Sequence, residues 1–470
     1  MYDLVIIGSG PGGYIAAIRA AQLGFKTAII EKEKLGGICL NWGCIPTKSL
    51  LESSYYYYKL DKKFSIHGIF VKHFSLDFYQ MLYRKNKIIH TISMEIKYLL
   101  NINKVDIFQG LASFKDSNTL HLISLEKEKL QSVIFNNAII ATGSIADDIP
   151  IFRIDKKRII SSTEAISLKD LPNHLIIIGG GVIGVEIASV YYRLGSKISL
   201  IEFCDHILSS MDIYICKDIH KILYILGIDF YLSTTVKTIQ VNTKEVVVCI
   251  KNNLTEVITL IGDYVLVAIG RNAYTKDLGL ENIGVFLKKK DFIPVNKKLQ
   301  TASNNIYAIG DVIGGQMLAH KAEKEGIFVV EQLAGNKPYI NYSLIPSVVY
   351  TSPEVAYVGK NQEQLRDEGI LYNIGKFPIR ALGRSRVSGE LDGFVMILSD
   401  KKTDEILGCH IISSRASEII MEAVVAMEFG ATAAEIAHIS HPHPTFSEAM
   451  REASNKIYTL SPITRSGNIN

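Results

Sequence analysis

Residues 2–32 read YDLVIIGSGPGGYIAAIRAAQLGFKTAIIEK, and this stretch predicts the fold of the first part of the chain. An apolar strand runs into Gly8, Gly10 and Gly13, and small and apolar residues at helical spacing follow. A second apolar strand then ends at Glu31. Strand, glycine-rich turn, helix, strand and acid in this order are typical of a dinucleotide-binding Rossmann unit.

Each part of this pattern has a physical role in holding a dinucleotide. Gly8 allows a tight turn, and Gly10 lets the backbone approach a pyrophosphate. Gly13 lets the helix lie close to the sheet, and the start of that helix supplies amide donors and positive potential. Glu31 is expected to accept hydrogen bonds from an adenosine ribose.

The same pattern occurs again at residues 174–203, where Gly179, Gly181 and Gly184 follow a strand and Glu202 ends the next one. The residues just after this acid distinguish NAD from NADP. The 2′-phosphate of NADP would need an Arg or Lys partner, but Phe203, Cys204 and Asp205 follow Glu202. Two carboxylates would repel a phosphate and suit a free hydroxyl. We therefore expect NAD at this second site.

Three further strands that end in glycine indicate that the first site takes a larger ligand. They lie within residues 138–144, 264–272 and 304–311. Asp311 follows the last of them and is well placed to hold the ribityl hydroxyls of a flavin. A plain helix N-cap is the other interpretation of Asp311. With the first glycine pattern present, we expect FAD at the first site.

The chain order predicts an α/β protein in which one Rossmann-like unit is inserted into another. Residues 1–147 and 272–343 are expected to form the FAD-binding domain, and residues 148–271 the NAD-binding domain. Residues 344–470 lack a glycine pattern and alternate β-branched strands with helices, which predicts a C-terminal α+β domain.

The composition excludes several classes of partner. A net charge of +4 without a dense Lys/Arg face argues against nucleic acid. No run approaches the roughly 18 apolar residues that a membrane-spanning helix needs. Met1 leads directly into an apolar strand without a basic leader pattern, so we expect a cytoplasmic protein.

The segment GGICLNWGCIPTK, residues 36–48, holds Cys39 and Cys44, which could form a zinc site, a structural bridge or a working dithiol. A zinc site usually needs four ligands, and the other four cysteines are scattered singly, so we expect no metal. Five residues advance about 7.5 Å along a helix, beyond the roughly 7 Å Cα limit of a disulfide. A bond would therefore need a distorted backbone, which Gly43 and Pro46 allow, and would favour a redox-active pair.

Thiol chemistry also needs a base, and the segment HISHPHPTFSEAMREA at residues 438–453 offers His438, His441 and His443. His443 stands between two prolines, and we expect Thr445 to cap a helix that brings Glu448 toward the imidazole. A carboxylate on one ring nitrogen raises the basicity of the other. The alternative is a capped helix preceded by surface histidines.

With these features together, the chain resembles the flavin-dependent pyridine nucleotide-disulfide oxidoreductases over nearly its whole length. The matching stretches are residues 8–24, 35–54, 139–144, 176–196, 305–312, 317–326 and 441–449. MLAHKAEKEG at 317–326 and the acid Glu202 favour the branch of this family that acts on lipoamide with NAD. Trp42 and the segment 270–275 depart from the family's pattern.

The resemblance implies a role for each matching residue. Cys39 would exchange with the dithiol substrate, Cys44 would lie next to the flavin, and Lys48 would lie near flavin N5. The resemblance assigns the remaining roles as follows: Glu186 pairs with Lys48, His443 is the acid/base held by Glu448, and Thr142, Gly143, Gly270 and Ala319 help to bind the cofactors.

The implied activity is oxidation of protein-bound dihydrolipoamide to lipoamide with reduction of NAD+. The enzyme would serve 2-oxo acid dehydrogenase complexes or the glycine cleavage system, with a lipoyl-bearing acyltransferase as its partner. The resemblance further implies a head-to-tail homodimer formed through residues 344–470, in which His443 of one subunit faces the disulfide of the other. The alternatives are another disulfide or mercuric reductase of the family and a non-catalytic FAD-binding docking subunit.

Overall fold

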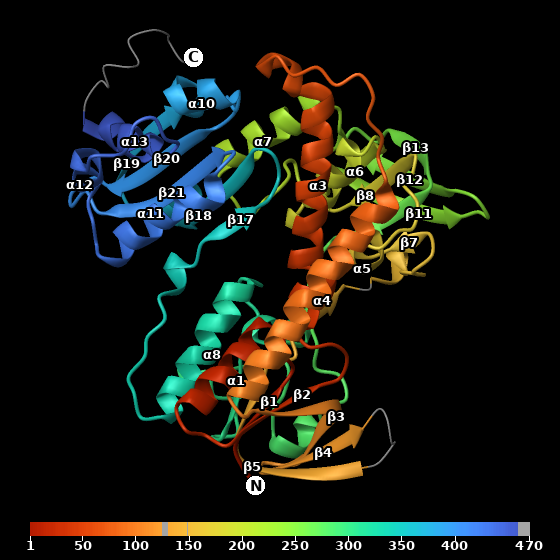
Figure 1. Cartoon of the computed structure of the whole chain (residues 1–470), viewed down its shortest axis with the longest axis vertical. Helices are drawn as coiled ribbons and strands as arrows, with labels where there is room; N and C mark the ends of the chain where they lie inside the picture. The colour runs from red at the N-terminus through yellow and green to blue at the C-terminus, as the bar shows by residue number, and fades with distance from the viewer. Residues whose placement is uncertain (125–129, 148, 459–470) are drawn as a thin grey trace.

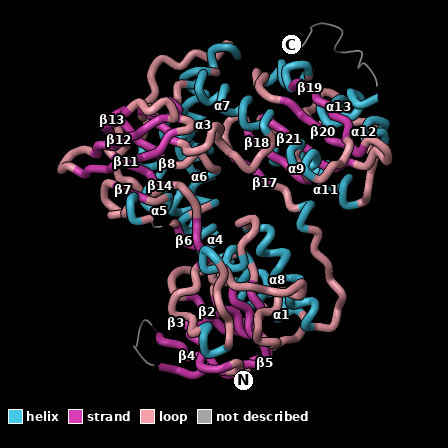
Figure 2. The backbone as a smooth tube through the Cα atoms, turned by 180° about the vertical axis from the view of Figure 1, so that it is seen from behind, coloured by secondary structure: helices cyan, strands magenta, loops and turns pink. Residues whose placement is uncertain are grey.

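The computed structural model describes residues 1–124, 130–147 and 149–458. These residues form three modules, each built on its own main sheet. The first module lies at one end of the molecule, and the second and third lie side by side at the other (Figure 1 and Figure 2). The predicted α/β fold class, with two Rossmann-like units and a C-terminal α+β unit, is confirmed.

The first module has a six-stranded sheet in the order β1-β2-β3-β4-β5-β16, in which β1 also pairs with β5. Its strands are β1 (Tyr2–Ile7), β2 (Thr27–Glu31), β3 (Asp106–Asp116), β4 (Thr119–Ser124), β5 (Leu130–Ile140) and β16 (Ile306–Ala308). Helices α1 (Pro11–Gln22) and α8 (Ala319–Leu333) pack against each other on this module. The parallel strands at its centre are buried apolar runs, as covered parallel strands require.

The second module repeats this arrangement with a parallel sheet in the order β10-β9-β8-β14-β7. These strands are β7 (Ile159–Ile160), β8 (His174–Ile178), β9 (Lys197–Ile201), β10 (Asp229–Tyr231) and β14 (Tyr264–Val267). An antiparallel sheet of β11 (Thr234–Val241), β12 (Val246–Asn252) and β13 (Val257–Gly262) accompanies it. Its helices are α5 (Ser162–Ala165), α6 (Val182–Arg193) and α7 (Ile213–Leu226).

One strand assignment from the sequence is wrong. The strand within residues 264–272 was counted with the first nucleotide site, although most of it lies in the range 148–271 expected for the NAD-binding domain. β14 pairs with β8 and β7 in the second sheet, which agrees with that range and not with the first site. A buried parallel strand looks the same in sequence whichever sheet it joins. The chain passes between the two modules at an antiparallel pair, β6 (Ser144–Ala146) with β15 (Arg271–Ala273).

The third module is an antiparallel sheet in the order β17-β18-β21-β20-β19 with helices packed on it. Its strands are β17 (Ser347–Val349), β18 (Glu354–Gly359), β19 (Tyr372–Pro378), β20 (Phe394–Asp400) and β21 (Ile406–Ser413). Its helices are α9 (Gln362–Asp367), α10 (Gly383–Ser388), α11 (Ala416–Glu428), α12 (Ala433–His438) and α13 (Glu448–Tyr458).

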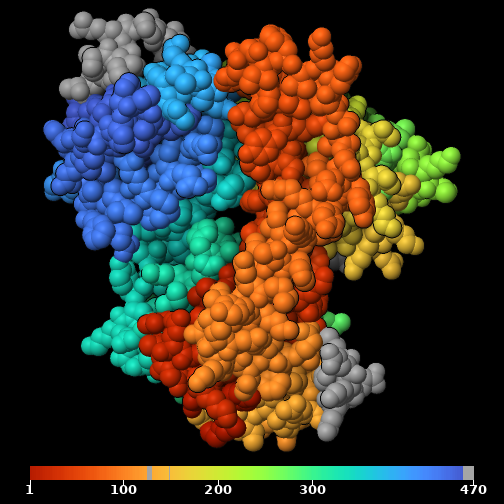
Figure 3. Space-filling view, in the orientation of Figure 1, coloured from red at the N-terminus to blue at the C-terminus, as the bar shows by residue number. Residues whose placement is uncertain are grey.

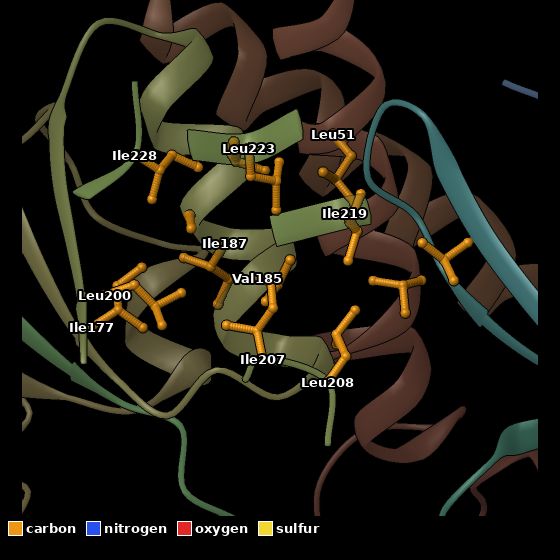
Figure 4. Packing of buried hydrophobic residues seen from close by; sticks show 14 of the residues in the cluster. Leu51, Ile177, Val185, Ile187, Leu200, Ile207, Leu208, Ile219, Leu223 and Ile228 are labelled. Atoms are coloured by element: carbon orange, nitrogen blue, oxygen red, sulfur yellow. The ribbon is translucent and has the colours of Figure 1, made fainter. Parts of the chain in front are cut away.

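A helical segment connects the modules: α2 (Gly37–Trp42), α3 (Cys44–Lys62) and α4 (Phe78–Ile102). In the space-filling view, α3 and α4 form a band between the third module and the second (Figure 3). Leu51 of α3 points into a buried cluster that also holds Ile219 of α7 (Figure 4). The same cluster includes Phe394 of the third module, so α3 joins the cores of two modules. Among the described residues, no helix combines the length and the apolarity needed to cross a bilayer.

We predict that Leu51→Ala destabilises the protein by about 2–5 kcal/mol, because it opens a cavity in a core shared by two modules. Leu51 is 5% exposed, whereas Leu99 on α4 is 40% exposed. The control Leu99→Ala should cost less than about 0.5 kcal/mol. Urea denaturation of both variants measures this difference, and equal shifts of the midpoint would contradict the shared core.

Candidate active site

A cavity of about 1720 Å³ is lined by residues of all three modules and collects most of the predicted site residues. Those that line it are Gly8, Gly10, Glu31, Cys39, Cys44, Lys48, Thr142, Gly143, Gly179, Gly181, Glu186, Glu202, Gly270, Asp311 and Ala319. Gly13, Gly184, His443 and Glu448 do not line the cavity. The two glycines have a packing role, whereas the His443–Glu448 pair lies elsewhere on the molecule.

The glycines of the two repeats have the same geometry. A Cβ on Gly13 would lie 2.0 Å from the Gly8 carbonyl oxygen, and a Cβ on Gly184 would lie 2.0 Å from that of Gly179. These third glycines therefore let each helix approach its strand. A Cβ on Gly10 would meet nothing within 4 Å.

The second glycines, Gly10 and Gly181, are the N-cap residues of α1 and α6, and neither helix start has a side-chain cap. A Cβ on Gly181 would also meet nothing within 4 Å. Open space in front of helix-start amides suits an anionic pyrophosphate. Both loops therefore fit the dinucleotide phosphates that the sequence predicts for them.

The two predicted ribose acids also hold the loops that they face. Glu31 accepts hydrogen bonds from the Ser9 amide at 2.9 Å and from the Ser9 hydroxyl at 2.6 Å. Glu202 accepts one from the Gly180 amide at 2.6 Å. Because the contacts are equivalent in the two modules, each acid fixes its glycine-rich turn against the end of the second strand.

Cys39 and Cys44 form a disulfide at the cavity wall. Helix α2 ends at Trp42 and α3 begins at Cys44, so the helix is interrupted at Gly43. The Cα atoms of the two cysteines are 4.7 Å apart, shorter than a continuous helix would allow. The expected distortion of the backbone is therefore present, and it occurs at Gly43.

Lys48, four residues after Cys44, forms an ion pair with the buried carboxylate of Glu186 in α6. Its Nζ lies 3.0 Å from Oε1 and 2.9 Å from Oε2 of that carboxylate. Tyr350 completes the group, because its amide donates to Glu186 Oε1 at 2.9 Å. Its ring centroid lies 4.6 Å from Lys48 Nζ. Tyr350 also lines the cavity. It was not predicted, since no local pattern links a residue after β17 to α3.

Asp311 lies in the short helix Gly310–Ile313, whose N-cap is Ile309, so Asp311 is not the N-cap considered as an alternative. Its Oδ2 accepts a hydrogen bond from the Ser144 hydroxyl at 2.5 Å. Arg271 Nε donates to the same hydroxyl at 2.8 Å. Burial lowers the pKa of Arg271, and the charge of Asp311 opposes that shift. This arrangement leaves a carboxylate at the cavity wall.

A buried ion pair on α8 holds the backbone beside Asp311. The Nζ atom of Lys321 lies 3.0 Å from Oε1 of Glu325, and the two side chains are 4% and 0% exposed. Glu325 accepts the Gly310 amide at 2.7 Å and the Tyr342 hydroxyl at 3.0 Å. Neither residue was predicted to be a support, although both lie within the stretch 317–326.

The two departures from the family's pattern are accommodated locally. Trp42 packs against the cluster that contains Leu51 and also lines the cavity. In the segment 270–275, the Tyr274 carbonyl accepts the Thr142 hydroxyl at 2.6 Å, and Lys32 Nζ lies 3.6 Å from the Tyr274 ring centroid. Neither departure removes a group from the cavity.

His443 lies between α12 and α13 and contacts Glu448, the first residue of α13, as expected. The Nδ1 atom of His443 lies 2.9 Å from Glu448 Oε1, and the His443 side chain is 74% exposed. Burial raises the pKa of Glu448, but the hydrogen bonds from the Thr445 amide and His443 lower it by more. The pKa of Glu448 therefore lies below its ordinary value. The carboxylate therefore stays ionised beside the imidazole.

The predicted cap of this helix is wrong. Helix α13 begins at Glu448, so Thr445 stands too far before it to be the N-cap. Instead, the Thr445 hydroxyl donates to the Pro442 carbonyl at 2.8 Å and its amide donates to Glu448 at 2.9 Å. His441 is not a free surface histidine either, because its Nε2 lies 2.7 Å from Glu422 and its side chain is 5% exposed.

Comparison with known proteins agrees with this architecture. Residues 2–326 match the family model described as pyridine nucleotide-disulphide oxidoreductase, and residues 345–454 match the dimerisation domain of the same family. The mitochondrial dihydrolipoyl dehydrogenase of Homo sapiens is 45% identical over 459 residues, which is 96% of this chain and 90% of the relative. The mitochondrial dihydrolipoyl dehydrogenase of Caenorhabditis elegans is 44% identical over 461 residues, which is 97% of this chain and 92% of the relative.

Solved structures show the same fold. The HOCl-induced flavoprotein disulfide reductase RclA from Escherichia coli, as its Cu(II) complex, is 28% identical with a TM-score of 0.86. That alignment covers 97% of this chain and 99% of RclA. LpdA from Mycobacterium tuberculosis has a TM-score of 0.89 at 24% identity, covering 97% and 100% of the two chains.

We predict that alanine has different effects at two glycines of the second module. Gly181→Ala should fold normally, because its Cβ enters open space, but it should weaken NAD+ binding about tenfold or more by blocking the pyrophosphate. Gly184→Ala should destabilise the module by about 1–3 kcal/mol through the clash with Gly179. Thermal unfolding and calorimetric titration with NAD+ separate the two effects. Equal melting temperatures for the two variants would contradict the packing role of Gly184.

Proposed function

The chain belongs to the pyridine nucleotide-disulphide oxidoreductase family, and from this premise we propose that it is an NAD-dependent dihydrolipoyl dehydrogenase. Such an enzyme oxidises protein-bound dihydrolipoamide to lipoamide and reduces NAD+. The observation that carries the proposal is the Cys39–Cys44 disulfide in the wall of a cavity shared by two dinucleotide loops. The relatives named above as dihydrolipoyl dehydrogenases support this substrate.

The cavity has room and partners for FAD and NAD. At the first site, the start of α1 would hold the FAD pyrophosphate and Asp311 the ribityl chain. At the second site, Gly181 and Glu202 would hold NAD. When bound, the flavin supplies a two-electron carrier between the cysteine pair and NAD+.

The same assignment gives each module a task. We propose residues 1–147 with 272–343 as the FAD-binding domain, 148–271 as the NAD-binding domain and 344–470 as the dimerisation domain. The change of module at the β6–β15 pair supports the first two boundaries. Residues 125–129, 148 and 459–470 lie outside the described part of the chain.

The cysteine pair oxidises the substrate by disulfide exchange. One thiolate of dihydrolipoamide attacks the sulfur of Cys39, and the Cys39–Cys44 bond breaks to leave a Cys44 thiolate. The second substrate thiol then attacks the mixed disulfide, closes the lipoamide ring and releases Cys39. Cys44 is the first residue of α3, where the positive end of the helix stabilises a thiolate. Its position therefore supports Cys44 as the leaving sulfur.

We propose that the base for this exchange comes from a second copy of the chain. His443 is exposed and lies outside the cavity that holds the disulfide of its own chain. Glu448 holds Nδ1, so Nε2 is the ring nitrogen that this exposed side chain would offer to a second copy. Helix α11 and its C-cap residue expose an apolar row of Met421, Val425 and Phe429, and residues 345–454 match a dimerisation domain. Both observations support a homodimer that completes the site.

The partner that delivers the lipoyl group would be an acyltransferase of a 2-oxo acid dehydrogenase complex or the carrier of the glycine cleavage system. The absence of a nucleic-acid or membrane partner, expected from the sequence, stays a prediction. The cytoplasmic location expected from the sequence stays a prediction, because the relatives compared above are named as mitochondrial.

We predict that the purified protein contains FAD and reduces NAD+ with dihydrolipoamide. With NADP+, kcat/KM should be about a hundredfold lower, because the carboxylates of Glu202 and Asp205 repel a 2′-phosphate. Steady-state assays with both nucleotides, and with glutathione and mercuric ion as other substrates of the family, test this. Turnover with glutathione or mercuric ion but none with dihydrolipoamide would contradict the proposal.

We also predict that two inactive variants complement each other in a mixed dimer. Cys44→Ser removes the disulfide of one chain, and His443→Gln removes the base, which is worth about 10²–10⁴ in rate. A heterodimer of the two, isolated with two affinity tags, would keep one complete site and about half of the wild-type activity.

The matched control is a heterodimer of Cys44→Ser with Cys39→Ser, which has no intact disulfide in either chain. It should stay inactive. An inactive Cys44→Ser/His443→Gln heterodimer would show that His443 acts on the disulfide of its own chain.

A further inference from the structure

The connecting helix α3, the second module and the third module meet at one group of residues in the wall of the cavity that also holds the disulfide. Lys48 comes from α3, Glu186 from α6 of the second module, and Tyr350 from the residue after β17 of the third module. We propose that Tyr350 is a positioning residue for the reaction, which holds the Lys48 ammonium in place through its aromatic ring and the Glu186 carboxylate through its amide. This inference rests on the proposed function, in which Lys48 lies next to the flavin.

Glu186 is nearly inaccessible to water, with 3% of its surface exposed. A buried carboxylate needs charged or hydrogen-bonding partners, because burial alone disfavours its ionised form. Lys48 Nζ contacts both oxygens, and the Tyr350 amide donates to Oε1. Two donors from outside the second module, one from α3 and one from the third module, therefore set the orientation of this carboxylate.

Lys48 has a different set of constraints. Its side chain is 32% exposed and it lines the cavity, so part of the side chain faces the space where the flavin would bind. A lysine side chain is flexible, and a single carboxylate leaves it free to pivot. The Tyr350 ring, with its centroid 4.6 Å from Nζ, supplies a second favourable contact, of the cation–π type. Glu186 and the ring together restrict the ammonium to one position.

The ring, and not the hydroxyl, makes the contact with Lys48. Burial raises the pKa of Tyr350, and Glu354 and Glu186 add to that shift, so the phenol stays neutral at physiological pH. A neutral phenol and a phenyl ring offer a cation a similar aromatic face. Phenylalanine should therefore replace Tyr350 in this role, whereas an aliphatic side chain should not.

The location of Tyr350 also connects Lys48 to the third module. Tyr350 directly follows β17, which pairs with β18. Helix α11 packs on the same sheet. The module that contains His443 and the dimerisation match thus contributes a contact to the Lys48–Glu186 pair. A purely structural residue would fill space at this junction without affecting the flavin.

The first experiment compares Tyr350→Leu with Tyr350→Phe in the FAD-loaded dimer. We expect Tyr350→Leu to lower kcat about three- to tenfold with little change in KM for dihydrolipoamide, and Tyr350→Phe to stay within about twofold of wild type. A redox dye in equilibrium with the bound flavin gives a second readout. In Tyr350→Leu, but not in Tyr350→Phe, this equilibrium should shift about three- to tenfold toward oxidised flavin, because a displaced ammonium stabilises the reduced flavin less.

Tyr372→Leu is the matched control, since Tyr372 belongs to the same module and packs against the cluster of Leu51 without lining the cavity. It should leave the dye equilibrium unchanged. Tyr350→Met, which is closer to tyrosine in length, replaces Tyr350→Leu if that variant does not retain FAD. An unchanged dye equilibrium in the FAD-retaining aliphatic variant, or an equal shift in Tyr350→Phe, overturns the proposal.

A double-mutant cycle decides whether Tyr350 acts through Lys48. In a Lys48→Met background, Tyr350→Leu should produce no further shift of the dye equilibrium. Additive shifts would show that the ring acts on the flavin site by another route and would overturn the proposal. The dye measurement needs bound FAD but no substrate, so it tests Tyr350 even if dihydrolipoamide is not the substrate.

Discussion

The buried carboxylate of Glu186 places the strongest constraint on how the three modules fit together. It is 3% exposed and belongs to α6, but its partners Lys48 and Tyr350 come from the connecting helix and from the third module. Removing either partner would leave an ionised group in a poorly solvated place. The relative placement of the modules therefore has to satisfy this one group, which also lines the cavity.

The disulfide depends on the same helix that carries Lys48. Because the backbone is interrupted at Gly43, Cys39 in α2 can reach Cys44 at the start of α3. The start of α3 then stabilises negative charge on Cys44, and Lys48 lies one turn further along. A single local break in a helix thus serves both the geometry of the bond and the electrostatics of the released thiolate.

The cavity of one chain collects the dinucleotide loops and the disulfide but not the base. His443 and Glu448 form their pair on the third module, whose α11 also exposes an apolar row. A long-range contact from Tyr350 of that module reaches the Lys48–Glu186 pair. In the proposed homodimer, the third module would therefore act at two disulfides, with His443 in the partner and with Tyr350 in its own chain.

The sequence by itself determined the features that depend on neighbouring residues. Both glycine-rich turns, their terminal acids and the bend at Gly43 are local, and short-range sterics are enough to specify them. The sheet that β14 joins, the start of α13 and the contact of Tyr350 with Lys48 were wrong or missed. Those three depend on packing between distant segments, and only the tertiary structure decides which buried strand, carboxylate or ring meets which partner.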